Sequence, residues 1–332
     1  MSGAVDWRPS ASPGVLRERA QLLARAREFF AARRVLEVDT ALVVNAPVSD
    51  VHIASASVTL GAAQPGAATA PPLYLHTSPE YAMKRLLAAG SGDIYQICHV
   101  VRGDERGRLH NPEFTLIEWY RVGMPLAALM DEVEALTRSL LGPAAAARRG
   151  ERLSYAEVFR RELGLDPLAA PSSDLARAAA RFGLEARAAD AGGDRDGLLE
   201  FLMAVAVGPR LGRGALTCVH GYPASQAALA RLDPQDPRTA LRFELYCEGV
   251  ELANGFQELQ SAGEQRARFT RDNAERARAG LPVAPADERL LAALGAGLPE
   301  CSGVALGFDR VLMLAVGAEH IDEVLAFPTS RA

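Results

Sequence analysis

Residues 101–121 read V-R-G-D-E-R-G-R-L-H-N-P-E-F-T-L-I-E-W-Y-R, and this stretch decides the fold. Arg102 ends one strand-like run, a polar turn follows, and a second run alternates apolar and polar residues, which predicts two strands joined by a loop. The Arg102 guanidinium can bind a phosphate through two hydrogen bonds. Glu118 and Tyr120 lie two positions apart, so a carboxylate and a phenol face the same way and can bind an amine. The pattern suits an enzyme that activates an amino acid with ATP, whereas an outward-facing polar pair on an edge strand is the plainer alternative for Glu118 and Tyr120.

The bulk composition is that of a globular protein. A chain of 332 residues can bury a full core, either as one large domain or as one domain with insertions. The net charge of -5 supplies no overall field that attracts nucleic acid. The four cysteines are scattered without a C-x-x-C pair, so neither zinc nor a disulfide framework is expected. No apolar run approaches membrane-spanning length, which predicts a soluble, cytoplasmic protein without a membrane partner.

Hydrophobic periodicity and turn residues predict elements along the chain. Helices are expected at 13–34, 125–141, 261–279 and 287–296, and strands at 35–44, 73–76, 216–219, 242–247 and 250–253. A further helix opens at Ser78 and Pro79, whose residue types are preferred at the N-cap and at the first helical position. The segment from about 142 to 210 looks largely helical and is expected to be an insertion within one catalytic domain.

Three further motifs carry candidate chemistry. T-S-P-E places Glu80 in the first turn of a helix, where a carboxylate could merely complement the helix dipole. In the stretch 243–259, Glu244, Glu251 and Glu258 recur every seven residues among apolar neighbours. Carboxylates beside ATP phosphates are ligands for Mg²⁺, and a metal-free hairpin with salt bridges is the alternative. Residues 303–310, G-V-A-L-G-F-D-R, predict a glycine-rich turn from a strand into a helix.

The motifs together resemble the class II aminoacyl-tRNA synthetases in their lysine-handling form. Residues 101–121 resemble motif 2, and residues 303–310 resemble motif 3. The helix and strand at 13–44 resemble motif 1, the dimer-interface element, although Ala41 stands where the family usually has proline. Class I motifs and a Walker A loop are absent from the sequence. The resemblance implies an α+β fold, with an antiparallel sheet flanked by helices, in a single catalytic domain over 1–332 that forms a homodimer.

The resemblance also implies roles for individual residues. Arg102 would hold the α-phosphate and the substrate carboxylate, and Arg310 would hold the γ-phosphate. The implied substrate-binding residues are Ser78, Pro79, Glu80, Glu118, Tyr120, Asn254, Glu258 and Ala305. The implied ATP-binding residues are Arg102, Gly103, Asp104, Asn111, Glu251, Leu252, Gly307 and Arg310, with Mg²⁺ at Glu244 and Glu251. The family usually has R-N-E where this chain has R-G-D at 102–104, and the shorter side chain of Asp104 puts its contact with adenine in doubt.

Two departures from the lysyl-tRNA synthetases narrow the resemblance. About a dozen residues precede the first predicted helix, too few for the anticodon-binding OB domain of those enzymes. Ala305 stands where they usually have glycine. Both features resemble the stand-alone paralogues that ligate (R)-β-lysine to a lysine of translation elongation factor P. The resemblance therefore implies ATP-dependent adenylation of (R)-β-lysine or lysine and transfer to that factor, with tRNA not expected as a partner.

Two other functions remain open from the sequence. One is a truncated lysyl-tRNA synthetase that still charges tRNA, and the other is a non-catalytic paralogue that binds lysine. The choice between α-lysine and (R)-β-lysine is open as well. Lys84 is the only lysine of the chain, which a GC-rich coding bias explains more simply than protection of a lysine-modifying enzyme from itself.

Overall fold

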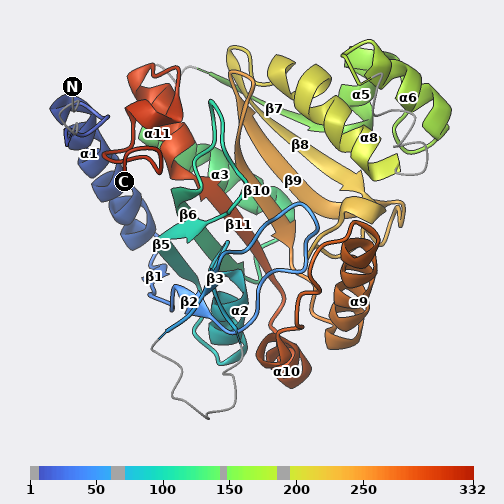
Figure 1. The fold of residues 1–332 in the computed structure, drawn as a ribbon, viewed down its shortest axis with the longest axis horizontal. Helices are drawn as coiled ribbons and strands as arrows, with labels where there is room; N and C mark the ends of the chain where they lie inside the picture. Colours follow the sequence, from blue (N-terminus) through green and yellow to red (C-terminus); the bar gives the residue numbers. More distant parts are fainter. Residues whose placement is uncertain (1–6, 61–71, 143–147, 185–194) are drawn as a thin grey trace, which may run out of the picture.

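One eight-stranded sheet organises the protein, as the computed structural model shows for residues 7–60, 72–142, 148–184 and 195–332 (Figure 1). In spatial order the strands are β1 (Leu36–Glu37), β5 (Ile94–Val101), β6 (Glu113–Val122), β11 (Cys301–Gly307), β10 (Val250–Gln257), β9 (Thr239–Cys247), β8 (Ala215–Pro223) and β7 (Arg149–Ser154). All pairs from β5 to β8 are antiparallel, whereas β1 pairs with β5, and β7 with β8, in parallel. The predicted α+β class is confirmed, and its sheet is mixed only at the two edges.

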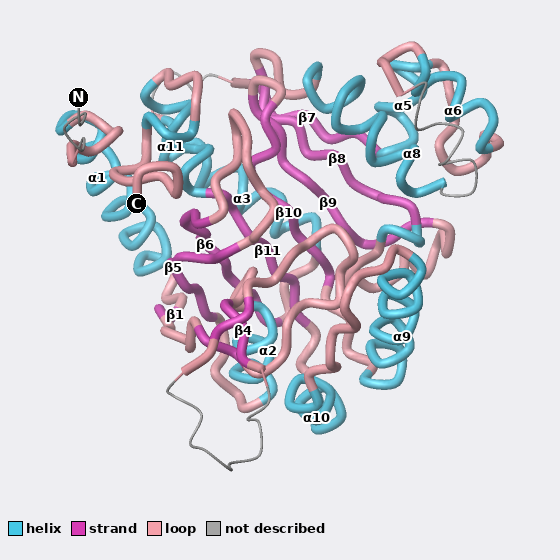
Figure 2. Tube along the Cα trace, in the orientation of Figure 1, coloured by secondary structure: helices cyan, strands magenta, loops and turns pink. Residues whose placement is uncertain are grey.

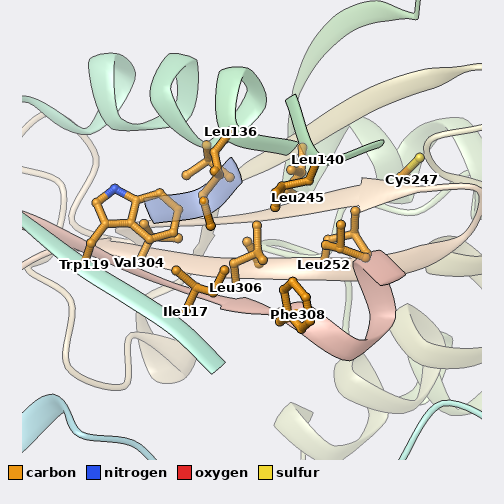
Figure 3. Close-up of a cluster of buried hydrophobic side chains, with 14 of the residues drawn as sticks. Ile117, Trp119, Leu136, Leu140, Leu245, Cys247, Leu252, Val304, Leu306 and Phe308 are labelled. Carbon is orange, nitrogen blue, oxygen red and sulfur yellow. The ribbon is translucent and has the colours of Figure 1, made fainter. Parts of the chain in front are cut away.

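Three helices cover one face of this sheet: α1 (Pro13–Ala32), α3 (Leu126–Leu141) and α11 (Phe308–Val316). Figure 3 shows Leu136 and Leu140 of α3 among the strand residues Ile117, Trp119 and Leu306, all of them buried. Side chains alternate along a strand, so Ile117 and Trp119 enter this core while their neighbours on β6 face the opposite side. Each such apolar side chain stabilises the fold by about 1.5–3 kcal/mol.

The other face carries a smaller layer. It includes α2 (Glu80–Ala88), α9 (Ala262–Arg278), α10 (Glu288–Gly297) and a three-stranded sheet of β2 (Val43–Val44), β4 (Leu73–Leu75) and β3 (Ser57–Val58). Met83 and Leu87 of α2 pack with Leu290 and Leu291 of α10 beside the buried Tyr120. Figure 2 shows long loop segments among these elements, crossing the central strands. This layer therefore leaves room for a cavity above the sheet.

The segment expected to be a helical insertion is helical over most of its described residues. It contains α5 (Tyr155–Leu163), α6 (Ser172–Ala180), α8 (Arg195–Leu202), a π-helical turn (Met203–Val207) and a 3-10 turn (Gly208–Arg210), while 143–147 and 185–194 lie outside the described residues. The helical prediction is wrong for β7. This edge strand is rich in arginine and lacks the apolar alternation of a typical strand, and pairing with β8 holds it extended. Tyr222 and Tyr246 of the sheet share one hydrophobic core with these helices. That residues 1–332 form a single catalytic domain stays a prediction.

Two local predictions need correction. The strand expected at 35–44 is interrupted, and its parts β1 and β2 join different sheets. The N-cap of α2 is Pro79 rather than Ser78. The Ser78 hydroxyl still accepts a hydrogen bond from the Glu80 N–H at 3.0 Å, a local contact typical of serine just before a helix. Two further 3-10 turns are Ala224–Gln226 and Ile321–Glu323.

Within the described residues, the helices are all too short or too polar to cross a membrane.

Candidate active site

A cavity of about 560 Å³ lies over the central strands. Its floor follows a row of paired residues on three neighbouring strands: Glu118 on β6 faces Ala305 on β11, and Ala305 faces Asn254 on β10. Facing residues of antiparallel strands point to the same side of the sheet, which brings three distant sequence positions together. Glu244 of β9 continues the row but is not among the described residues that line the cavity.

One end of the cavity, called the amine end here, is built from the carboxylates of Glu80, Glu118 and Glu258 with the phenol of Tyr120. Glu118 accepts hydrogen bonds from the hydroxyls of Ser78 and Tyr120, each at 2.7 Å. Burial raises the pKa of Glu118 to about 7, and the nearby negative charge of Glu80 is the second cause of this rise. A buried carboxylate with a raised pKa gains from an added cation, so the end favours an ammonium group.

Lys84 contacts two of these carboxylates from the protein interior and was not predicted as a site residue. Its Nζ lies 2.6 Å from Glu80 Oε1 and 2.6 Å from Glu258 Oε2. Lys84 and Glu258 are each only 1% exposed. Burial by itself lowers the pKa of Lys84, but the carboxylates of Glu258 and Glu80 outweigh it and the net shift is upward. Its place one helical turn after Glu80 was the available sequence signal.

β11 gives the amine end its shape. A Cβ at Gly303 would lie 2.3 Å from Tyr120 Cε1 and 2.4 Å from Glu258 Oε1, so a side chain there would displace both groups. Ala305 and Gly307 follow at alternate positions of β11 and also line the cavity. The Ala305 methyl group therefore sits on the floor between Glu118 and Asn254, where the sequence predicted a pocket residue.

The other end, called the phosphate end here, carries Arg102. Its Nε donates to the carbonyl oxygen of Thr77 at 3.3 Å, and its Nη1 to Glu105 at 3.2 Å. The guanidinium carbon lies 5.1 Å from the ring centre of Phe114. Arg102 lines the cavity and is held from three sides, which leaves its remaining donors for an anion.

Arg310, in the first turn of α11, is the second arginine of the phosphate end. It donates to the backbone carbonyls of Glu251 at 2.9 Å and Leu109 at 3.3 Å. Its Nη2 lies 2.7 Å from His110 Nε2. Burial, and then the Arg310 charge, lower the pKa of His110, so the neutral ring can accept this bond. Carbonyl and imidazole acceptors orient Arg310, and the Glu251 carboxylate lies 3.5 Å from its Nη1.

The two predicted metal ligands occupy different surroundings. Glu251 lines the cavity, 3.5 Å from Arg310, because a bulge between Glu251 and Ala253 shifts the register of β10. Burial and the charge of Glu244 raise the pKa of Glu251. Glu244 instead accepts hydrogen bonds from Tyr222, Tyr246 and Arg242. Among the described residues, the acidic, histidine and cysteine side chains form no ready-made group of three for a metal ion.

The remaining predicted nucleotide contacts are divided. Asn111, Leu252 and Gly307 line the cavity, and the Asn111 amide also donates to the Glu113 carbonyl and accepts from the Thr329 N–H. Gly103 and Asp104 are exposed and lie outside the described lining. Pro79 likewise contributes only as the N-cap of α2.

Sequence reasoning missed several charged or titratable side chains at the cavity. Among them, Glu105, His110 and Arg242 line it, and Lys84 supports the amine end. Arg242 donates to Asn254 Oδ1 at 3.2 Å and so positions a floor residue. Glu105 directly follows Asp104, and Arg242 lies two positions before Glu244 on β9. Nearness to a predicted residue was the available signal for each.

Comparison with known proteins agrees with this geometry. A family model described as class II tRNA synthetases (D, K and N) matches residues 2–331. A protein of Vibrio cholerae is 50% identical over 98% of this chain and 99% of its own length. Proteins of Proteus mirabilis and Edwardsiella ictaluri are each 50% identical over the whole of both chains. All three relatives are named elongation factor P--(R)-β-lysine ligase. The resemblance carried by the sequence motifs is confirmed, and the chain belongs to the class II tRNA synthetase (D, K and N) family.

Proposed function

We propose that this protein uses ATP to activate (R)-β-lysine, or lysine, and transfers the aminoacyl group to a lysine side chain of translation elongation factor P. The observation that carries the proposal is one cavity with three carboxylates at one end and two arginines at the other. A diamino acid can place its ammonium groups at the amine end and its carboxylate toward Arg102. The names of the full-length relatives support the substrate and the acceptor.

Chemistry at the phosphate end needs no protein nucleophile. A substrate carboxylate oxygen attacks the α-phosphorus of ATP and pyrophosphate leaves, so the protein contributes positioning and charge neutralisation. Arg102 stabilises the negative charge that grows on the α-phosphate oxygens, and Arg310 binds the terminal phosphate. An acceptor lysine that has lost its proton then attacks the acyl carbon, and AMP leaves.

The acidic side chains fit a metal that is mostly coordinated by phosphate. Glu251 would hold Mg²⁺ at the cavity wall, and bound Mg²⁺ would neutralise phosphate charge during adenylation. The metal role of Glu244 stays a prediction, because its carboxylate already accepts three hydrogen bonds. In the 102–105 loop, Glu105 lines the cavity and Asp104 does not, so we assign the acidic nucleotide contact of this loop to Glu105.

The proposal includes a cytoplasmic homodimer. Leu36 of the edge strand β1 is 56% exposed and follows the helix that resembles motif 1. The four cysteines are free in the structure, as in a reducing compartment. Light scattering should give twice the chain mass, and Leu36→Asp should shift it toward one chain mass. A monomeric wild-type protein would refute the dimer and leave the chemistry untouched.

Pyrophosphate exchange with each lysine isomer tests activation. Exchange should depend on Mg²⁺ and on an added lysine isomer, with (R)-β-lysine preferred. Incubation with ATP, (R)-β-lysine and elongation factor P should then add one aminoacyl mass at a single lysine, as seen by mass spectrometry. An unmodified factor together with acylated tRNA would show a truncated lysyl-tRNA synthetase instead, and lysine binding without exchange would show a non-catalytic paralogue.

A further inference from the structure

The amine end contains an internal cation as well as its three carboxylates. Lys84 bridges Glu80 and Glu258 through its Nζ, at 2.6 Å from each. Glu118, the third carboxylate, is satisfied by hydroxyl donors instead. When the three carboxylates are ionised, a state that bound ammonium groups favour, Lys84 offsets one of three negative charges and the amine end keeps two. (R)-β-lysine and lysine each carry two ammonium groups. The two negative charges of the pocket therefore balance the two positive charges of the amines it would receive.

We propose that Lys84 is a positioning residue that sets the amine end at two negative charges and thereby matches it to an amino acid with two ammonium groups. This inference rests on the proposed function and specifies the substrate class of the same site. Arg102 at the phosphate end would receive the substrate carboxylate, so the charges of the whole amino acid find partners. A substrate with one ammonium group would leave one carboxylate of the amine end without a cation.

The packing around Lys84 supports a structural cation rather than a reactive amine. Its side chain rises from α2 one turn after Glu80 and is almost completely buried, with Met83 and Leu87 in the core on either side of it in sequence. A buried lysine loses its proton readily unless carboxylates hold it charged. Two carboxylates do so here, and a protonated amine is not a nucleophile. Lys84 therefore stays an ammonium group beside a site where acyl groups are activated.

The other groups near Glu258 show what removal of Lys84 would do. Glu80 of α2, Glu118 and Tyr120 of β6, and Cys301 at the start of β11 all interact electrostatically with Glu258. Among these neighbours and Lys84, only Lys84 is cationic. Burial raises the pKa of Glu258 to about 8, and the Lys84 charge opposes that rise. Without Lys84 the Glu258 pKa moves further up, so the carboxyl group keeps its proton to a higher pH.

Substitution of Lys84 by methionine tests this charge balance, because methionine has a similar length and no charge. In Lys84→Met, the KM for (R)-β-lysine at pH 7 should rise about tenfold for each unit by which the Glu258 pKa increases. The KM of the variant should keep falling as the pH rises above 8, where that of the wild type levels off, while kcat changes little. Calorimetric titration at pH 8.5, in two buffers of different ionisation enthalpy, should show more protons released per substrate bound than in the wild type, because Glu258 is then largely ionised in the wild type alone.

Lys84→Arg is the matched control, since it keeps the positive charge while changing the shape. It should retain the proton count of the wild type even if its packing raises the KM, and thermal melting should show that both variants fold. Equal KM increases at every pH in Lys84→Met, with no additional proton release, would overturn the charge role. Failure of the wild type to bind any lysine isomer would instead refute the proposed function, so the two failures are distinct.

Discussion

The amine end and the phosphate end of the cavity hold their charges in opposite ways. At the amine end, buried carboxylates face one another and accept hydrogen bonds from Ser78, Tyr120 and Lys84. At the phosphate end, Arg102 and Arg310 are 26% and 20% exposed at their side chains. Each donates to backbone carbonyls and also lies near one carboxylate, Glu105 at 3.2 Å and Glu251 at 3.5 Å. Carbonyl acceptors orient a guanidinium whose partly exposed donors can still meet an anion, whereas crowded carboxylates raise one another's pKa. The comparison supports the proposal that the amine end selects the substrate and that the phosphate end supplies positive charge for the reaction.

The largest effect is expected from a substitution that disables the phosphate end alone. Arg102→Ala should lower the rate of pyrophosphate exchange by about 100- to 1000-fold, because it removes a charge that stabilises the transition state. The matched control is Arg106→Ala, which removes an exposed arginine from the same loop and should leave exchange unchanged. Circular dichroism should show that both variants fold. Exchange that survives Arg102→Ala would separate this arginine from the chemistry.

A smaller effect is expected at the amine end. Glu118→Gln preserves the shape but removes a buried negative charge, and should raise the KM for (R)-β-lysine by about 10- to 100-fold, since a charge-assisted hydrogen bond contributes about 1.5–3 kcal/mol. The KM for ATP should stay within about twofold, as measured by exchange kinetics with each substrate varied in turn. A parallel rise in both constants would contradict the division of the cavity into two ends.

Ala305 tests selectivity between the two amino acids. Ala305→Gly removes the methyl group between Glu118 and Asn254, and should raise the use of α-lysine relative to (R)-β-lysine by about 10- to 200-fold at most. The measurement is the ratio of kcat/KM values for the two isomers. A ratio equal to that of the wild type would remove Ala305 from the selectivity argument, although the amine end could still bind both ammonium groups.

The smallest effect concerns stability without substrate. The pKa of Glu118 is raised to about 7, above its unfolded value near 4.3, so the folded protein binds the proton more tightly. The free energy of unfolding should therefore fall by about 1–3 kcal/mol as the pH rises from about 4.3 to 7, through this group. Urea unfolding of wild type and Glu118→Gln should show a shallower pH dependence in the variant. Equal slopes would mean that Glu118 ionises freely in the fold.

Local patterns predicted much of the fold. Helices α1, α3, α9 and α10 agree closely with the amphipathic runs, because helix periodicity is written in neighbouring residues. The two-strand reading of residues 101–121 agrees with β5 and β6 and the loop between them. The edges were harder to predict. β7 and the interrupted run at 35–44 depend on which strand lies beside them, and a single sequence contains no such information.

Sequence alone predicted the motifs, their order, and the residue types proposed to bind amines and phosphates. The tertiary structure alone decided how these residues combine. Seven-residue spacing would place Glu251 and Glu258 on opposite faces of a regular strand, and the bulge in β10 brings both to one cavity. Lys84 gained its partners in the same way, because Glu258 approaches it only across the fold. Charge balance in a buried pocket depends on distances between strands and helices, and those distances are set by packing rather than by position in the chain.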